Sequence, residues 1–284
     1  MKIEYDCIPC IYRQILEAGR MVTDDRQIIR KILNEFARMI PEIKADESAP
    51  LVVTRIQNYI KDITDESDPY AEFKEKNIKL ALEHYKEVEE IVEKSSDPLR
   101  AALVMSAVGN SIDAGVSLEV DIKSNVKDAV SSGFKYSDND KFKKNLKSAD
   151  KVLIIADNAG EAVFDRLLIK ELDDFNVEII YAVRDQAILN DVTLKEAHQI
   201  GFGEHCQVIS SGCDSPGMIL DRASDEFLKL YQETDIIISK GQGNLEGLLG
   251  VDRPIFFLLK IKCNLIAERL GSQFKTGDFI FKLI

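Results

Sequence analysis

Asp157 and Asn158 are the residues whose types and position most clearly indicate chemistry. They follow the apolar run 151–156 and precede the amphipathic segment 162–172, so a buried strand is expected to end, and a helix to begin, at this pair. Open α/β sheets bind their ligands at the carboxyl ends of parallel strands. A carboxylate and an amide oxygen in that place indicate a metal or phosphate site.

Asp191 follows the next expected strand, 177–183, and adds a third oxygen. Because the carboxyl ends of parallel strands share one edge, the side chains of Asp157, Asn158 and Asp191 are expected to meet. This set suits a hard divalent ion such as Mg2+ or Mn2+. The competing interpretation is that the residues merely cap the helices that follow them.

A glycine-containing turn, Lys240-Gly241-Gln242-Gly243-Asn244, follows the expected strand 234–239. Its backbone N–H groups and the charge of Lys240 suit a phosphate. The turn has neither the ending of the nucleotide P-loop nor the glycine spacing of dinucleotide-binding proteins. Ser211, in the loop after 206–210, is a second candidate for anion binding, with an ordinary turn as the alternative.

Two features of the first half are also candidates. Asn110 and Asp113 end an apolar helical stretch, where they either cap the helix or reach the edge of the sheet. Cys7 and Cys10 form a Cys-x-x-Cys pair, which is half of a metal site, a redox pair or two packed thiols. The remaining cysteines supply no second pair of this spacing, and they are Cys206, Cys213 and Cys263.

The elements that position these residues change in type near residue 150. Apolar positions recur every three or four residues in 8–21, 26–40, 51–63, 70–94 and 99–110, which predicts helices. From Lys151, β-rich runs alternate with helical segments; they are 151–156, 177–183, 206–210, 234–239, 254–259 and 279–283. The pattern predicts an α/β fold: a Rossmann-like α/β/α domain with a mostly parallel sheet, 146–284, and an all-helical N-terminal domain, 1–145.

The composition restricts the possible functions. A net charge of −12 argues against binding of nucleic acid or of an anionic membrane surface, since both require clustered Lys and Arg. No apolar run approaches the roughly 20 residues of a membrane span. The first residues lack the apolar centre of a signal peptide, and five cysteines at scattered spacings do not form a disulfide framework, so we expect a cytoplasmic protein.

Five blocks in this order resemble the damage-control phosphatases, a family formerly described as domain of unknown function 89. The blocks are Asp6–Cys10, Gly109–Asp113, Asp157–Glu161, Asn190–Thr193 and Ser239–Glu246. The resemblance covers nearly the whole chain. It implies a metal-dependent phosphatase of small phosphorylated metabolites, such as sugar phosphates or damaged cofactor intermediates, supported by Mn2+, Co2+, Ni2+ or Mg2+.

The resemblance places the metal ligands at Asp157, Asn158 and Asp191, and the lysine-glycine loop at Lys240 and Gly241. We expect a metal-activated water to attack a phosphomonoester whose oxygens are held by the Lys240 loop. A covalent aspartyl-phosphate at Asp157 is less favoured. Haloacid-dehalogenase-type phosphatases use a second Asp, two positions after the first, as acid/base, and here that position is Ala159.

The remaining candidates contact the substrate or support the site. Asn110 and Asp113 are expected to bind its hydroxyl-bearing part, and Glu161 either orients a metal-bound water or complements the helix N-terminus. Two other functions stay open. One is an S-adenosylmethionine-dependent carboxyl methyltransferase, of whose sequence features only Gly160 and Asp185 are present; the other is a non-catalytic protein that binds phosphorylated metabolites or metal.

Overall fold

The computed structural model describes residues 1–112, 129–203 and 205–284. Its centre is a seven-stranded sheet in the order β1-β7-β6-β5-β2-β3-β4. The strands are β1 (Tyr136–Ser137), β2 (Lys151–Ile155), β3 (Glu178–Val183), β4 (Gln207–Ser210), β5 (Ile236–Lys240), β6 (Phe256–Lys260) and β7 (Phe279–Leu283). Neighbours are parallel except β6 and β7, which are antiparallel. The expected α/β fold with a mostly parallel sheet is confirmed.

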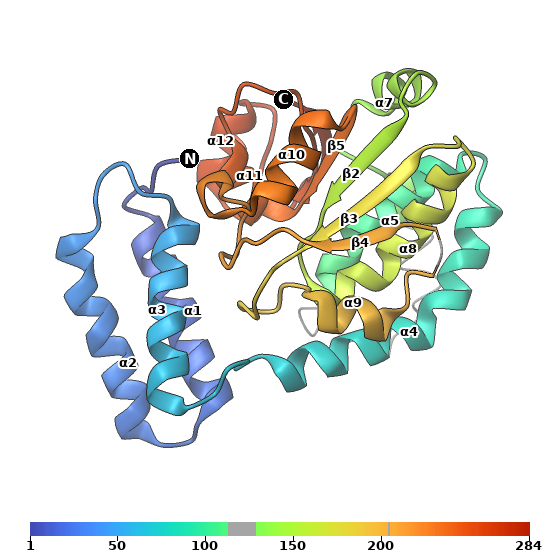
Figure 1. Ribbon diagram of the computed structural model, residues 1–284. Coiled ribbons are helices and arrows are strands. Elements are labelled where there is room, and N and C mark those ends of the chain that lie inside the picture. Colours follow the sequence, from blue (N-terminus) through green and yellow to red (C-terminus); the bar gives the residue numbers. More distant parts are fainter. Residues whose placement is uncertain (113–128, 204) are drawn as a thin grey trace.

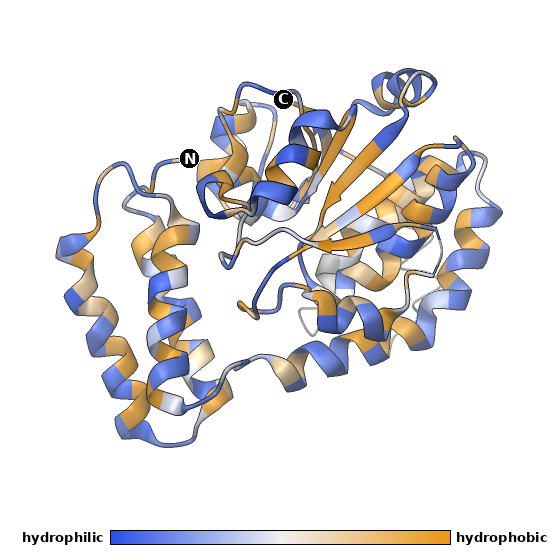
Figure 2. Ribbon diagram, in the orientation of Figure 1, coloured by the Kyte–Doolittle hydropathy of each residue, from blue (hydrophilic) through white to orange (hydrophobic). Residues whose placement is uncertain are grey.

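Helices cover both faces of this sheet (Figure 1). One face carries α4 (Ala71–Glu93), α5 (Pro98–Ile112), α7 (Asn139–Leu146), α8 (Ala159–Asp173) and α9 (Leu194–Ile200). The other carries α10 (Asp225–Glu233), α11 (Gly241–Leu248) and α12 (Asn264–Leu270). Side chains alternate along a strand, so Val152 and Ile154 of β2 pack on the first face, whereas Leu153 and Ile155 pack on the second. Burial on both faces explains why the strands are continuous apolar runs, as their colour in Figure 2 shows.

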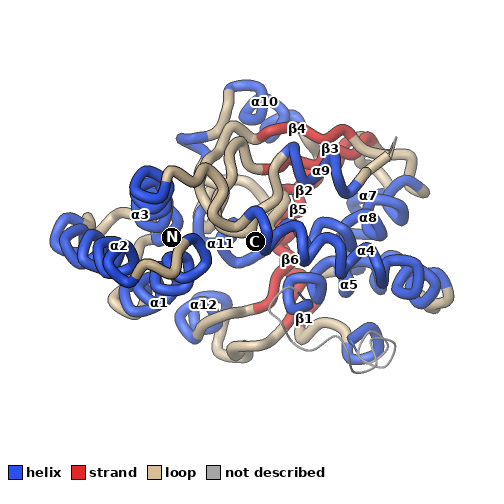
Figure 3. The backbone as a smooth tube through the Cα atoms, turned by 90° about the horizontal axis from the view of Figure 1, so that it is seen from below, coloured by secondary structure: helices blue, strands red, loops and turns tan. Residues whose placement is uncertain are grey.

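The first three helices form a separate bundle. They are α1 (Cys7–Val22), α2 (Arg26–Met39) and α3 (Ala49–Thr64), and a short 3-10 turn, Ile40–Glu42, lies in the connection between α2 and α3. Their apolar faces meet in a core of their own that includes Ile32, Phe36 and Ile56. In Figure 3 this bundle lies beside α11 and α12.

The apolar cores group the elements differently from the expected division at residue 145. Of the described helices before β2, α4, α5 and α7 share one continuous core with α8 and the sheet, whereas α1–α3 have a core of their own. Phe142 of α7 stacks edge-on against Phe256 and Phe281 of β6 and β7, which ties this helix to the sheet. Of the described helices, none is both long and apolar enough to cross a membrane.

Candidate active site

Asp157, Asn158 and Asp191 meet at the carboxyl edge of the sheet. The segment after β2 pairs with the loop after β3 through an antiparallel bridge between Asn158 and Asp191. Two backbone hydrogen bonds flank the bridge, from Val192 N to Asp157 O at 2.9 Å and from Ala159 N to Asn190 O at 2.9 Å. The three side chains that the sequence predicts as ligands therefore stand together.

All three line one cavity of about 630 Å³, which is enclosed jointly by the bundle and the sheet edge. The bundle contributes the first turns of α1 and α3, and the sheet side contributes the loops after β2, β3, β5 and β6. The bundle residues are Asp6, Cys7, Cys10, Ile11, Gln14, Ala49, Pro50 and Val53. Cys7, Cys10 and Cys263, which are far apart in sequence, thus line the same cavity as the acids, and burial raises the pKa of the Cys7 and Cys10 thiols.

Helix capping does not explain these residues. Asn158 occupies the N-cap position of α8, but its side chain makes no capping hydrogen bond. Its Nδ2 instead donates to Asp157 Oδ2 at 3.0 Å and to Glu161 Oε2 at 3.3 Å. Both amide hydrogens are then used, and the amide oxygen is the atom left to act as a ligand. At α9 the cap is Thr193, which forms a capping box with Glu196, so Asp191 has no capping role.

Arg184 fixes Asp191 from below. Arg184 Nε donates to Asp191 Oδ2 at 2.7 Å, and its NH2 donates to Asn244 Oδ1 at 2.6 Å. Only 1% of the arginine is exposed. Burial raises the pKa of Asp191 to about 7; Arg184 opposes this rise, and the nearby charge of Asp157 adds to it. Asp157 and Asp191 are thus two buried carboxylates, and Arg184 is the cation beside them on the side of the core. A further cation in the cavity would stabilise their negative charges.

Asn244 joins the loops beneath the acids. Its Nδ2 donates to Ala156 O at 2.9 Å and to Lys240 O at 2.7 Å. Its Oδ1 accepts from Met218 N at 2.7 Å as well as from Arg184. One side chain therefore ties together the ends of β2, β3 and β5. Asn244 stands in the glycine-containing turn after β5 and Arg184 directly follows β3, but no sequence pattern indicated this role for either residue.

Lys240 lies behind the cavity and does not line it. Its Nζ donates to Asp165 Oδ1 at 2.6 Å, to Ser106 O at 3.0 Å and to the carboxylate of Glu161. The side chain is fully buried and all three of its hydrogens are used. This position differs from the phosphate contact that the sequence suggests. Here Lys240 is the counter-ion of two buried acids.

Glu161 connects this buried group with the metal candidates. Burial raises its pKa to about 8; the charges of Asp157 and Asp165 act in the same direction, and Lys240 opposes them. Its second oxygen accepts from Asn158, as described above. The carboxylate of Glu161 holds the amide of Asn158 and lies in the first turn of α8; the two roles expected for it, orienting a metal-bound water and complementing the helix N-terminus, stay predictions.

Gly241 allows Asp157 to occupy its place. The glycine has φ +78°, in the left-handed region, and a Cβ built on it would overlap the carboxylate of Asp157. The residue therefore acts by being small, and it forms the floor on which the carboxylate rests.

Lys262 is a cavity residue that the sequence analysis did not single out. It follows β6, and it is the only Lys or Arg among the described residues that line this cavity. Within the described ranges its side chain has no carboxylate partner within ion-pair distance, while its backbone N donates to Gln242 Oε1 at 2.8 Å. Its charge opposes the rise in the pKa of Asp191 and of Glu246, which indicates that it faces both acids. Its position at the end of a fifth parallel strand is the sequence signal that identifies it.

The other predicted residues are placed as follows. Ser211 lies fully buried at the end of β4, where its Oγ accepts from Cys213 N at 3.3 Å, and it does not line the cavity. The side chain of Asn110 and the whole of Asp113 lie outside the described residues. The helix that carries Asn110 does approach the site, because a Cβ on Gly109 would lie 3.2 Å from Glu161 Cα.

The donor set fits a hard divalent ion. Two carboxylates and one amide oxygen converge on the cavity, and oxygen ligands of this kind suit Mg2+ or Mn2+. In the part of the chain that the structure describes, no group of three or more His, Cys, Asp or Glu residues is arranged to hold a metal. Any ion bound by Asp157, Asn158 and Asp191 would therefore complete its coordination with water or substrate.

Known proteins share this architecture and sequence. The profile of the damage-control phosphatase ARMT1-like domain matches residues 3–276. The chain is 34% identical to the uncharacterized protein MJ0202 of Methanocaldococcus jannaschii, over 98% of this chain and 94% of that protein. It is 32% identical to a damage-control phosphatase of Archaeoglobus fulgidus, over the full length of both.

A solved structure agrees over the whole chain. The crystal structure of a DUF89 family protein, PH1575 of Pyrococcus horikoshii, superposes with a TM-score of 0.90 and 28% identity, covering 99% of this chain and 98% of that one. In a sequence alignment the damage-control phosphatase PH1575 is 30% identical over 95% of this chain and 94% of its own length. The chain belongs to the damage-control phosphatase ARMT1-like family.

Proposed function

We propose that this protein is a metal-dependent phosphatase that hydrolyses small phosphorylated metabolites. The observation that carries the proposal is the convergence of Asp157, Asn158 and Asp191 with Lys262 on a single cavity. The relatives from Archaeoglobus fulgidus and Pyrococcus horikoshii, which bear the name damage-control phosphatase, support it. A cavity of about 630 Å³ suits a small metabolite and is too small for a folded macromolecule.

Asp157, Asn158 and Asp191 would hold a divalent ion, with Mn2+, Co2+, Ni2+ and Mg2+ as the candidates. When bound, such an ion polarises a phosphoryl oxygen and lowers the pKa of a water ligand. The protein's own part is to keep the ligands in position. Glu161 turns the amide oxygen of Asn158 toward the cavity, and Arg184 holds one oxygen of Asp191 so that the other is available.

Lys262 would hold the phosphoryl oxygens. A phosphomonoester brings up to two negative charges into a cavity already lined by carboxylates, so a cation on the lining is needed to offset the repulsion. Lys240 cannot supply it in this arrangement, because its ammonium is sealed between Glu161 and Asp165. The bundle residues above the site, with Pro50 and Val53 among them, would exclude bulk water from the bound phosphate.

A metal-activated screen tests the proposal. The purified chain is stripped with a chelator and then supplied with Mn2+, Co2+, Ni2+ or Mg2+ in the presence of p-nitrophenyl phosphate and a panel of phosphorylated metabolites. We expect phosphate release that requires the metal and that is lost in Asp157→Ala. Absence of turnover with every ester and metal would refute the proposal, and calorimetric titration with S-adenosylmethionine would then test the methyltransferase alternative.

A further inference from the structure

Lys74 of α4 is a buried cation that lies outside the active-site cavity. Only 1% of its side chain is exposed, and its Nζ lies 2.8 Å from Asp68 Oδ2 and 2.8 Å from Glu196 Oε1. Burying an ammonium costs several kcal/mol unless carboxylates compensate it closely. The three charged groups therefore hold together the chain between α3 and α4, helix α4 and the start of α9.

Glu196 uses its other oxygen to hold the loop that contains Asp191. Its Oε2 accepts from Thr193 N at 3.0 Å and from Thr193 Oγ1 at 2.6 Å. Thr193 follows Val192, whose N–H bonds to the carbonyl of Asp157. A chain of contacts thus runs from Lys74 through Glu196 and Thr193 to the backbone between two of the proposed metal ligands.

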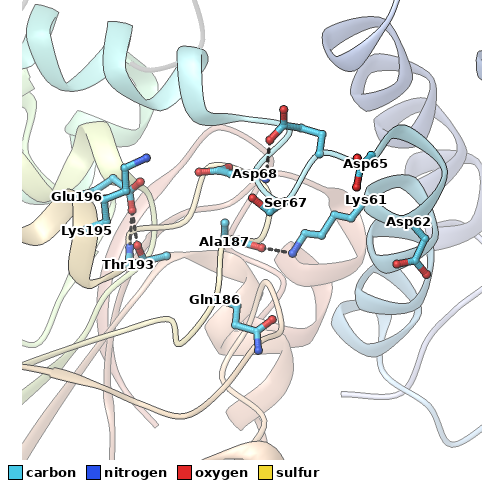
Figure 4. A pocket seen from close by; sticks show the side chains of 11 residues that line it. Lys61, Asp62, Asp65, Ser67, Asp68, Gln186, Ala187, Thr193, Lys195 and Glu196 are labelled. Atoms are coloured by element: carbon cyan, nitrogen blue, oxygen red, sulfur yellow. Dashed lines mark hydrogen bonds between the residues drawn. The ribbon is translucent and has the colours of Figure 1, made fainter.

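The same loop is held at its other end by a second lysine. Lys61 of α3 donates from Nζ to the carbonyl oxygen of Ala187. Figure 4 shows both ends of this arrangement in the lining of a cavity of about 750 Å³: Lys61 reaches from α3 to Ala187, and Glu196 bonds to the neighbouring Thr193. Residues 187–193 are therefore fixed by two lysines of the helical N-terminal region.

We propose that Lys74 is a positioning residue of the active site: through Glu196 and Thr193 it sets the loop that carries Asp191. The proposal rests on the proposed function for the metal that Asp191 binds. The placement of the loop itself follows from the contacts alone. Burial by itself would raise the pKa of Glu196, but Lys74 and the hydrogen bonds from Thr193 bring it below its ordinary value, which keeps the carboxylate charged and bound to both partners.

Lys170 provides a matched control. It also pairs with two carboxylates, Glu89 at 3.0 Å and Glu93 at 2.7 Å, but its side chain is 45% exposed and touches no residue of the 187–193 loop. Both Lys74→Met and Lys170→Met remove one ammonium from a pair of acids. Only the first removes it from Glu196, which bonds to the loop that carries Asp191.

The experiment measures amide hydrogen exchange and Mn2+ binding in the same variants. In the metal-free protein, peptides covering 186–196 are expected to exchange at least about tenfold faster in Lys74→Met than in the wild type, relative to the β2 and β3 peptides of the same sample. Lys170→Met is expected to leave this ratio unchanged. By calorimetry, the Kd for Mn2+ should rise about tenfold in Lys74→Met, the lower end of the effect of residues that orient metal ligands.

A second variant covers the case in which Lys74→Met does not fold. Glu196→Gln keeps an acceptor for Thr193 but removes the charge that pairs with Lys74, so the 186–196 peptides and Mn2+ affinity should shift in the same direction. Unchanged loop exchange in a folded variant would overturn the proposal. Faster loop exchange in a protein whose wild type binds no Mn2+ would support the positioning role and refute the metal-dependent function, so the two failures are distinguishable.

Discussion

Two groups of charged and polar side chains lie side by side at the carboxyl edge of the sheet, and they face opposite ways. The first, the cavity group, is Asp157, Asn158, Asp191 and Lys262, all of which line the cavity beneath the bundle. The second, the sealed group, is Lys240, Glu161 and Asp165, which are buried between β5, α8 and α5. Asn158 and Glu161 are in contact, so the two groups share a border.

The difference lies in how their charges are compensated. In the sealed group the ammonium of Lys240 contacts both acids, and Asp165 also accepts from Tyr181 Oη at 2.7 Å and Ser106 Oγ at 2.6 Å. In the cavity group Asp157 accepts from Asn158 and Asp191 accepts from Arg184, and both carboxylates line a solvent-connected cavity. The comparison shows that the role of a charged residue at this edge depends on the groups that it contacts. Lys240, whose three ammonium hydrogens are all bonded within the protein, stabilises the fold.

The largest expected effect is that of removing a cavity acid. Asp157→Ala should lower metal-dependent phosphatase activity by at least about a thousandfold, because a residue acting as part of a unit in the reaction is lost. Its thermal unfolding should stay close to that of the wild type. Asp185→Ala, at the same edge but exposed, is the control and should retain activity; equal losses in both variants would contradict a specific role of the cavity group in the reaction.

Removing the cation of the sealed group should act on stability first. Lys240→Met leaves Glu161 and Asp165 buried without their counter-ion, which should cost about 3–5 kcal/mol in the free energy of unfolding measured with urea. Lys170→Met, whose ion pairs are solvated, should cost at most about 1 kcal/mol. If Lys240→Met is instead as stable as the wild type and loses only affinity for phosphate, Lys240 belongs to the cavity group.

The converse holds for Lys262. Lys262→Met should weaken competitive inhibition by inorganic phosphate by roughly 10–100-fold, the equivalent of one charge-assisted hydrogen bond. The free energy of unfolding should change by no more than about 0.5 kcal/mol, as for other substitutions without a buried partner. A stability loss as large as that of Lys240→Met would contradict the placement of Lys262.

A substitution at Gly241 tests two effects together, backbone strain and displacement of the Asp157 carboxylate. Gly241→Ala should cost about 1–3 kcal/mol for a residue with φ in the left-handed region. It should also weaken Mn2+ binding in calorimetry, since the new Cβ displaces the carboxylate of Asp157. Gly250→Ala is the matched control, because Gly250 has φ +95° but nothing within 4 Å of a new Cβ; it should lose stability and keep its Mn2+ affinity.

The smallest effect is expected for the cysteine at the bundle. Cys10→Ser should change turnover by no more than about twofold, the range of substitutions at exposed positions. Partial burial raises the pKa of its thiol, which disfavours the thiolate that would bind a metal. A loss comparable to that of Asp157→Ala, measured in the same assay, would place the cysteines within the cavity group.

The sequence was sufficient to predict the fold and the proximity of Asp157, Asn158 and Asp191, for one physical reason, while their role as metal ligands stays a prediction. Parallel strands bring their carboxyl ends to one edge, so residues after the strands at 151–156 and 177–183 could be expected to meet, and the Asn158–Asp191 bridge is that meeting. Strand alternation also predicts the direction in which the side chain of Lys240 points. It lies two residues after Ile238, which packs on the face of α5 and α8, and its side chain points the same way.

The remaining parts of the site depend on contacts that no local pattern specifies. The bundle reaches the cavity through the first turns of α1 and α3, and the position of a separate helical core on a sheet edge is not encoded in the periodicity of its helices. For the same reason α4 and α5 were assigned to the helical region, although they pack on the sheet. The place of Lys262 in the cavity and the ion pair of Lys74 with Glu196 both require that packing to bring together segments more than 60 residues apart.

Asn244 has a consequence for how the protein folds. Its amide receives and gives hydrogen bonds to Ala156, Arg184, Met218 and Lys240, which are spread over more than 80 residues of the chain. These hydrogen bonds can form together only after β2, β3 and β5 have paired. Pairings of such long sequence separation form slowly. We therefore expect the catalytic edge to appear late and all at once during folding, so that a partly folded chain presents no competent metal site.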